Sequence, residues 1–242
     1  MISRTDDVIA GIDGCPGGWI AAFARGGEVR LEILPRFADV LAKHPAVIAV
    51  DMPIGLPERS GPGGRAAENA VRPLLGARQS SVFSVPSRRA VYAETYAEAC
   101  AAALATSDPP RKVSKQLFNI AKKIREVDTA LRASPALVAR VFEVHPELAF
   151  WRMNGERALD QPKKVKSRCY APGLALRRAL LISAGFSSEI VNAAPPKGAG
   201  PDDVLDALAC AAVAQRLRDG RAKPFPDPPE RDAYGLPMAI WA

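Results

Sequence analysis

The chain of 242 residues carries a formal net charge of +7, and 48% of its residues are hydrophobic against 24% that are charged. These values are ordinary for a soluble globular protein and exclude an intrinsically disordered or collagen-like chain. A chain of this length forms one large domain or two small ones, and it can bury roughly three quarters of its unfolded surface.

The basic balance, with a pI of about 9.4, permits an anionic partner such as nucleic acid, but a solvated Arg-rich surface would give the same balance. The four cysteines lie far apart without a C-x-x-C pair, so we expect neither disulfides nor structural zinc. No apolar run approaches roughly 18 residues, and the start lacks a basic leader followed by an apolar segment. We therefore expect a cytoplasmic protein with no membrane association.

The first predicted elements are three strands joined by short turns. Residues 8–13 (VIAGID) and 19–24 (WIAAFA) are short runs of β-forming residues, separated by the turn sequence GCPGG. After a second turn, residues 29–34 (VRLEIL) alternate apolar with charged side chains. Three consecutive strands joined in this way form an antiparallel meander.

A short helix over residues 37–44 leads into a fourth strand at 46–51 (AVIAVD), whose unbroken apolar run is typical of a strand covered on both faces. Because a helical crossover connects it to the meander, this strand is predicted to run parallel to the first. Asp13 and Asp51 then end two strands that point the same way. If these strands are neighbours, the two carboxylates meet at the carboxyl edge of the sheet, where open α/β sheets bind ligands.

The remainder of the chain predicts a fifth strand and several helices around one α/β domain spanning residues 1–242. Residues 53–138 predict an irregular and helical insertion within it. The fold class is a ribonuclease H-like mixed five-stranded sheet, with the first three strands antiparallel and the fourth and fifth parallel to the first. The other expected elements are helices near 65–75, at 93–105, 114–131, 173–185 and 202–220, a strand followed by a helix within 139–151, and an edge strand at 238–242.

Several acidic residues are predicted to be buried. Asp13 and Asp51 end strands, Glu143 lies within the apolar VFEVH, and Asp206 lies one turn into an apolar helix. Buried carboxylates are costly unless they are paired, hydrogen-bonded or bound to a cation, and Mg²⁺ and Mn²⁺ prefer oxygen ligands. Asp203 and Asp206 share a helix face, so either can supply a ligand. The sequence therefore predicts a Mg²⁺ or Mn²⁺ site at these acids.

Five spaced motifs carry a resemblance to a known family. GIDGCPGGW, DMPIGLP, SSVF-x-VPSR, EVHPE and DDVLDALA resemble an uncharacterised family of predicted RNase H-like nucleases, the domain of unknown function 429. The pattern D-x-x-D-A-L-A is also similar to the last catalytic helix of RuvC-type resolvases. The resemblance implies a two-metal phosphodiesterase site with Asp13, Asp51, Glu143 and either Asp203 or Asp206 as its catalytic acids.

Such a site predicts hydrolysis of phosphodiester bonds, with DNA or RNA as the expected partner, although the sequence leaves DNA, RNA, a branched junction and a small phosphate ester open as the substrate. Two cations about 4 Å apart would activate a water on one side of a phosphodiester and stabilise the leaving oxygen on the other. Arg88, Lys122, Lys163 and Lys164 are candidates for contacts to backbone phosphates, although a solvated face would carry the same residues. The segment PKKVKSRCYAPG departs from the family pattern, in which a lysine pair commonly precedes a glycine and an arginine.

Two alternatives remain open. The same strand order underlies the actin-like ATPases, in which a glycine-rich hairpin cradles phosphates, and DGCPGGW is suited to that role. Those enzymes usually need two such domains, which 242 residues do not supply. A binding protein that has kept the fold without activity is the other alternative. His145, before Pro146, is predicted to be a hydrogen-bonding residue at a strand-to-helix corner rather than a catalytic base.

Overall fold

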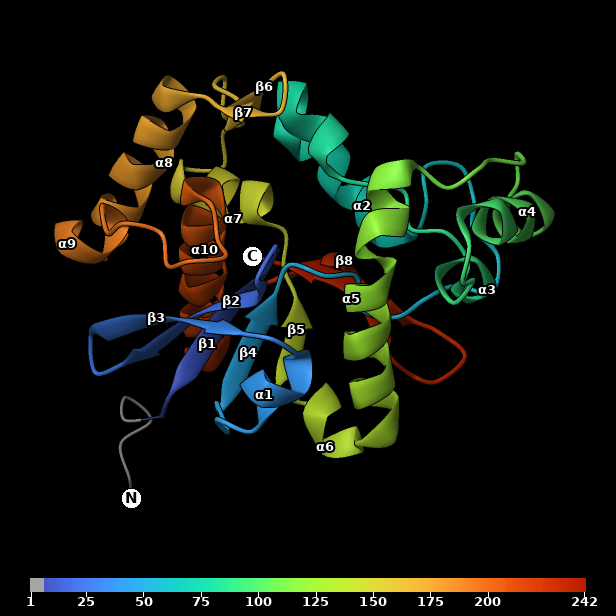
Figure 1. Cartoon of the computed structure of the whole chain (residues 1–242), viewed down its shortest axis with the longest axis horizontal. Coiled ribbons are helices and arrows are strands. Elements are labelled where there is room, and N and C mark those ends of the chain that lie inside the picture. Colours follow the sequence, from blue (N-terminus) through green and yellow to red (C-terminus); the bar gives the residue numbers. More distant parts are fainter. Residues whose placement is uncertain (1–6) are drawn as a thin grey trace.

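The computed structural model describes residues 7–242, and its centre is one mixed sheet of five strands (Figure 1). The strands are β1 (Ile9–Cys15), β2 (Gly18–Arg25), β3 (Glu28–Leu34), β4 (Val47–Val50) and β5 (Val141–Glu143), in the spatial order β3-β2-β1-β4-β5. The first three strands pair antiparallel, and β4 and β5 run parallel to β1. The mixed five-stranded α/β sheet predicted from the sequence, with its strand directions, is thereby confirmed.

Helices cover both faces of the sheet. The helical elements are α1 (Phe37–Leu41), α2 (Ala66–Val71), η2 (Arg72–Ser81), α3 (Arg88–Val91), α4 (Tyr96–Thr106), α5 (Lys115–Ala133), α6 (Pro135–Val138), α7 (Pro146–Met153), α8 (Ala171–Ser183), α9 (Ser188–Val191) and α10 (Pro201–Arg218). Helices α1 and α5 pack on one face of the sheet. Helices α7, α8 and α10 pack on the other. Among the described residues, none of these helices has both the length and the apolar character needed to cross a bilayer.

The alternation of side chains along β1 separates the core from the site. Ala10 and Ile12 point into the core that α5 covers, with Ile48 and Val50 of β4 beside them. The odd-numbered residues of β1 therefore face α10, and Asp13 is the carboxylate among them, near the end of the strand. The strand pattern that makes the sheet thus also directs this carboxylate toward α10.

The C-terminal segment forms a strand close to the one predicted at 238–242, but this strand lies outside the five-stranded sheet. Strand β9 (Pro237–Trp241) pairs antiparallel with β8 (Pro224–Arg231) in a separate two-stranded sheet. An isolated bridge between Val144 and Trp241 joins it to the end of β5. The partner strand β8 was not predicted, because its several prolines lack the N–H of a regular ladder and hide the strand from sequence patterns. A small hairpin of β6 (Lys164–Val165) and β7 (Arg168–Cys169) was also not expected.

A glycine sets the distance between β1 and α10. A Cβ atom on Gly11 would lie 2.0 Å from the backbone nitrogen of Ala211 and 2.3 Å from the carbonyl oxygen of Ala207. Backbone atoms cannot yield to such an overlap as a flexible side chain can. Gly11 therefore allows α10 to approach β1 closely enough for the side chain next to Ala207, that of Asp206, to reach the end of the strand.

We expect Gly11→Ala to lower the free energy of unfolding by about 3 kcal/mol, because the added methyl group forces α10 away from β1. Urea denaturation followed by circular dichroism measures this change. The control is Gly61→Ala, where a Cβ atom would have its nearest neighbour 4.0 Å away. Equal stability of the two variants would show that the close packing of α10 is not required.

Candidate metal centre

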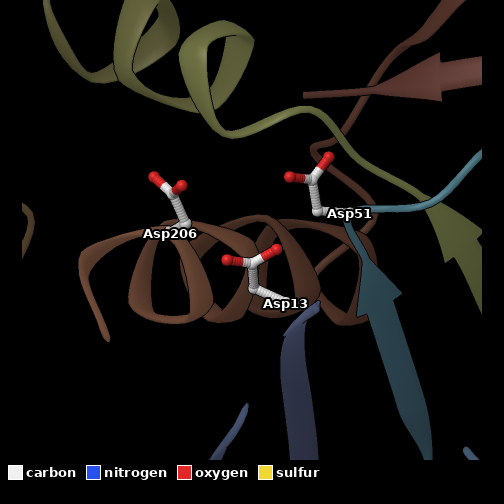
Figure 2. Close-up of side chains that lie close together, drawn as sticks. All are labelled: Asp13, Asp51 and Asp206. Carbon is white, nitrogen blue, oxygen red and sulfur yellow. The ribbon is translucent and has the colours of Figure 1, made fainter. Parts of the chain in front are cut away.

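Three aspartates meet at the carboxyl edge of the sheet. Asp13 lies in β1, Asp51 directly follows β4, and Asp206 lies in α10. Figure 2 shows the three side chains gathered where β1 and β4 end, beside α10. One oxygen from each residue lies within 4.8 Å of the others. The residues come from three distant parts of the sequence, so the fold, and not local sequence, brings them together.

The parallel pairing of β1 and β4 sets the positions of the first two acids. Ile12 lies opposite Val50, and the N–H of Asp51 donates to the carbonyl oxygen of Ile12 at 2.9 Å. Asp13 and Asp51 therefore leave the sheet side by side. The N–H of Gly14 donates to Asp13 Oδ1 at 2.7 Å and orients that carboxylate.

Asp206 carries both a paired and an unpaired oxygen. Its side chain is buried, and Oδ2 accepts from the ammonium of Lys163. Oδ1 is also buried but has no hydrogen-bond partner among the described residues. An orphaned acceptor in a buried site is costly, whereas a cation among the carboxylates would satisfy it. This oxygen fits a site that receives a metal ion.

Lys163 is held in place through its backbone. The N–H of Tyr170 donates to its carbonyl oxygen at 2.9 Å. The preceding segment packs tightly on α8, where a Cβ atom on Gly173 would lie 1.8 Å from the carbonyl oxygen of Pro162. The buried Arg177 also donates to the carbonyl oxygen of Gln161 at 3.0 Å. Sequence analysis did not predict this support of Lys163. The local feature that indicates it is Gly173, where a side chain would clash with the backbone of Pro162.

The electrostatics of the triad favour a bound cation. Burial, followed by the charges of Asp51 and Asp206, raises the pKa of Asp13 well above its usual value. Burial also raises the pKa of Asp51 and that of Asp206 to about 6 in each case, although Lys163 opposes the rise. Three ionised aspartates and one lysine leave a formal charge of −2, which one divalent cation would neutralise. The triad could therefore hold a divalent metal ion.

Glu143, predicted as a catalytic acid, is paired with an arginine. Its carboxylate accepts from Arg65 through both oxygens, at 2.6 and 3.0 Å, and from the N–H of Ile54 at 2.7 Å. Arg65 also pairs with Glu68, and all three charged side chains are buried. Glu143 lines the same cleft but is not one of the three converging acids. Through these contacts, Glu143 holds Arg65 and the backbone of Ile54 in place beside the triad.

The two acids in the first turn of α10, Asp202 and Asp203, have different partners. Asp203, predicted as an alternative to Asp206, accepts from the N–H of Gly200 at 2.8 Å and closes the first turn of the helix. Asp202 forms an ion pair with Lys164 at 2.5 Å. Both aspartates line the cleft, but neither belongs to the triad.

Two of the basic residues predicted to contact phosphate lie away from the cleft. Arg88 is buried and paired with Asp128 and Asp232, which anchors the C-terminal segment to α5. Lys122 is exposed on α5 and does not line the cleft. Of the four predicted basic residues, Lys163 and Lys164 are the two that line it.

Two further sequence features also have structural roles. His145 lies at the corner between β5 and α7, with Nε2 3.2 Å from the carbonyl oxygen of Ser81. Burial lowers the pKa of its imidazole. In the glycine-rich hairpin, the N–H of Gly17 donates to the carbonyl oxygen of Gly198 at 2.8 Å and that of Gly14 to Asp13. These amides are therefore not free to cradle a phosphate in the actin-like manner.

The triad opens into a cleft of about 410 Å³. Its lining combines the acids and lysines of the site with residues from two other regions: Arg78, Ser80, Ser81 and Phe83 around the end of η2, and Gln116 and Ile120 of α5. The cleft therefore gives a ligand access to the three carboxylates and offers both polar and apolar contacts beside them.

Comparison with protein families agrees with the resemblance seen in the five motifs. Residues 11–231 match the model of the family described as "Protein of unknown function (DUF429)". The chain belongs to this family. Comparisons with curated proteins and with solved structures found no match. Membership of DUF429 assigns no activity, so the chemistry rests on the site itself.

We expect the affinity for Mn²⁺ to fall at least about tenfold between pH 7 and pH 5, because protons compete for carboxylates with pKa values of about 6. Isothermal titration calorimetry measures this dependence. Asp13→Asn should weaken binding at both pH values. An affinity that does not change with pH, or an Asp13→Asn variant that binds as the wild type does, would contradict a metal site at the triad.

We expect Glu143→Gln to destabilise the fold by about 3–5 kcal/mol while the protein that remains folded keeps its Mn²⁺ affinity, because the change removes a charged partner of the buried Arg65. Denaturant unfolding and calorimetry measure the two effects separately. Loss of metal binding without loss of stability would instead place Glu143 among the ligands.

Proposed function

We propose that this protein is a divalent-metal-dependent nuclease that hydrolyses phosphodiester bonds of nucleic acid at the Asp13–Asp51–Asp206 triad. The observation that carries the proposal is the convergence of three carboxylates, from two strand ends and one helix, in a cleft open to a ligand. A structural role alone would leave the orphaned oxygen of Asp206 and the mutual repulsion of the acids unexplained.

The three aspartates would hold Mg²⁺ or Mn²⁺ through oxygen ligands, which both ions prefer. A cation bound there supplies Lewis-acid activation of a phosphodiester and of the attacking water. The chain contributes the geometry: hydrogen bonds from backbone amides hold Asp13 and position Asp51, and close packing on β1 holds Asp206. This preorganisation is what would make the carboxylates effective ligands at neutral pH.

Lys163 tunes the charge of the triad. Its ammonium pairs with Asp206 and lowers the pKa of that carboxyl group relative to the effect of burial alone. The ammonium of Lys163 would share this carboxylate with a cation held by the triad. Lys163 thus favours the ionised form of these acids, because its charge opposes the rise in their pKa values.

Nucleic acid is the substrate class that the charge distribution favours. The protein has a net charge of +7, so a polyanion is attracted over long range even though the base of the cleft is acidic. Metal-assisted hydrolysis needs no histidine base, and the buried His145 already contacts the carbonyl oxygen of Ser81. The apolar Phe83 and Ile120 along the cleft provide surface against which a nucleobase can pack.

We expect Asp13→Asn and Asp51→Asn to lower metal-dependent cleavage at least about a hundredfold while the fold is retained, because each change removes a charged ligand. Single-stranded, duplex, hybrid and junction substrates are incubated with Mg²⁺ or Mn²⁺, and the products are separated on denaturing gels. Asp160→Asn makes the same chemical change at an exposed residue outside the cleft and serves as the control. Full activity in either triad variant, or none in the wild type on any substrate, would refute the proposal.

A further inference from the structure

Four lysine or arginine side chains line the cleft, and one of them stands apart. Arg65 pairs with Glu68 and Glu143, Lys163 with Asp206, and Lys164 with Asp202. The fourth, Arg78, has no carboxylate partner among residues 7–242, and its Nε atom is buried without a hydrogen-bond acceptor. The cleft thus contains one guanidinium whose charge the described residues do not compensate.

The chain presents Arg78 on a defined turn. Gly76 interrupts η2 with φ 50° and ψ −120°, a conformation that glycine adopts without steric cost. Beyond this break, Ser81 Oγ donates to the carbonyl oxygen of Arg78 at 2.8 Å, and the carbonyl oxygen of Ser81 contacts His145. The turn is therefore held against the corner between β5 and α7. Through this contact, the SSVF motif and His145 together hold the turn that carries Arg78.

An acidic site that acts on a polyanion needs positive charge beyond the reacting centre. The lysines predicted for this task, Lys163 and Lys164, are already paired with aspartates of α10. A guanidinium presents a planar fork of donors that matches the geometry of phosphate oxygens. Ser80 and Gln116, both exposed, line the same cleft and add polar groups near such an anion.

We propose that Arg78 binds a backbone phosphate of the nucleic-acid strand, next to the phosphate that is hydrolysed at the triad. This inference rests on the proposed nuclease function and assigns it a substrate-binding residue. Arg78 replaces Arg88 and Lys122 in that role, because the former is consumed in buried ion pairs and the latter lies outside the cleft.

The test measures binding separately from cleavage. Fluorescence anisotropy follows a short, fluorescein-labelled single-stranded oligonucleotide titrated with protein in Ca²⁺, at several salt concentrations. We expect Arg78→Gln to raise the Kd about tenfold or more, and to reduce the slope of log Kd against log salt by about one, because one charged phosphate contact is lost. Arg78→Lys should recover part of the affinity, since lysine keeps the charge but not the fork.

Arg25→Gln is the matched control. Arg25 is exposed at the end of β2, beside the start of β1 and thus at the opposite edge of the sheet from Asp13. We expect this variant to change the Kd less than about twofold, because long-range attraction alone is weakened. Equal Kd values and equal salt slopes for Arg78→Gln and Arg25→Gln would overturn the inference. Thermal unfolding verifies folding, and Arg78→Lys decides the question if Arg78→Gln does not fold.

The results separate this inference from the proposed function. If Asp13→Asn abolishes cleavage while Arg78→Gln binds as the control does, the nuclease function stands and the role of Arg78 is refuted. If binding depends on Arg78 but no substrate is cleaved, the phosphate contact stands and the hydrolysis is refuted.

Discussion

The central constraint on this structure is the energetic cost of burying three carboxylates side by side at one edge of the sheet. Asp13, Asp51 and Asp206 have raised pKa values because burial penalises each charge and each carboxylate repels its neighbours. Lys163 offsets one of the three charges. A fold that keeps such a cluster forgoes stability that three apolar side chains would provide, and the capacity to hold a divalent cation is a physical reason to keep it.

The rest of the fold serves to maintain this convergence. Parallel pairing places two acids at one edge of the sheet, and Gly11 lets α10 bring the third acid to them. Around the cleft, other charged groups are neutralised in pairs, such as Arg65 with Glu143 and Arg177 with Glu147. These buried ion pairs hold together the segments that form the walls of the cleft. By contrast, the triad with Lys163 keeps a formal charge of −2, and Arg78 has no carboxylate partner among the described residues.

Sequence reasoning could predict the acids at the sheet edge because strand direction follows from connection type. The parallel relation of β1 and β4 follows from the two antiparallel reversals of the meander and the helical crossover after β3, and it places Asp13 and Asp51 at the same edge. The partner of Glu143 could not be predicted, because Arg65 lies 78 residues earlier in a segment without periodic pattern. The pairing of β8 was also hidden, since prolines mask its strand character. The pairing of Glu143 with the distant Arg65 is therefore the reason that the predicted set of acids is larger than the observed triad.

The most direct test of a cation at the triad is anomalous diffraction from crystals soaked in Mn²⁺. The account predicts a peak bonded to oxygens of Asp13, Asp51 and Asp206, with the ammonium of Lys163 displaced from Asp206 or sharing that carboxylate with the ion. A soaked crystal without a peak there, in which Lys163 still pairs with Asp206 and the other two acids point apart, would contradict it.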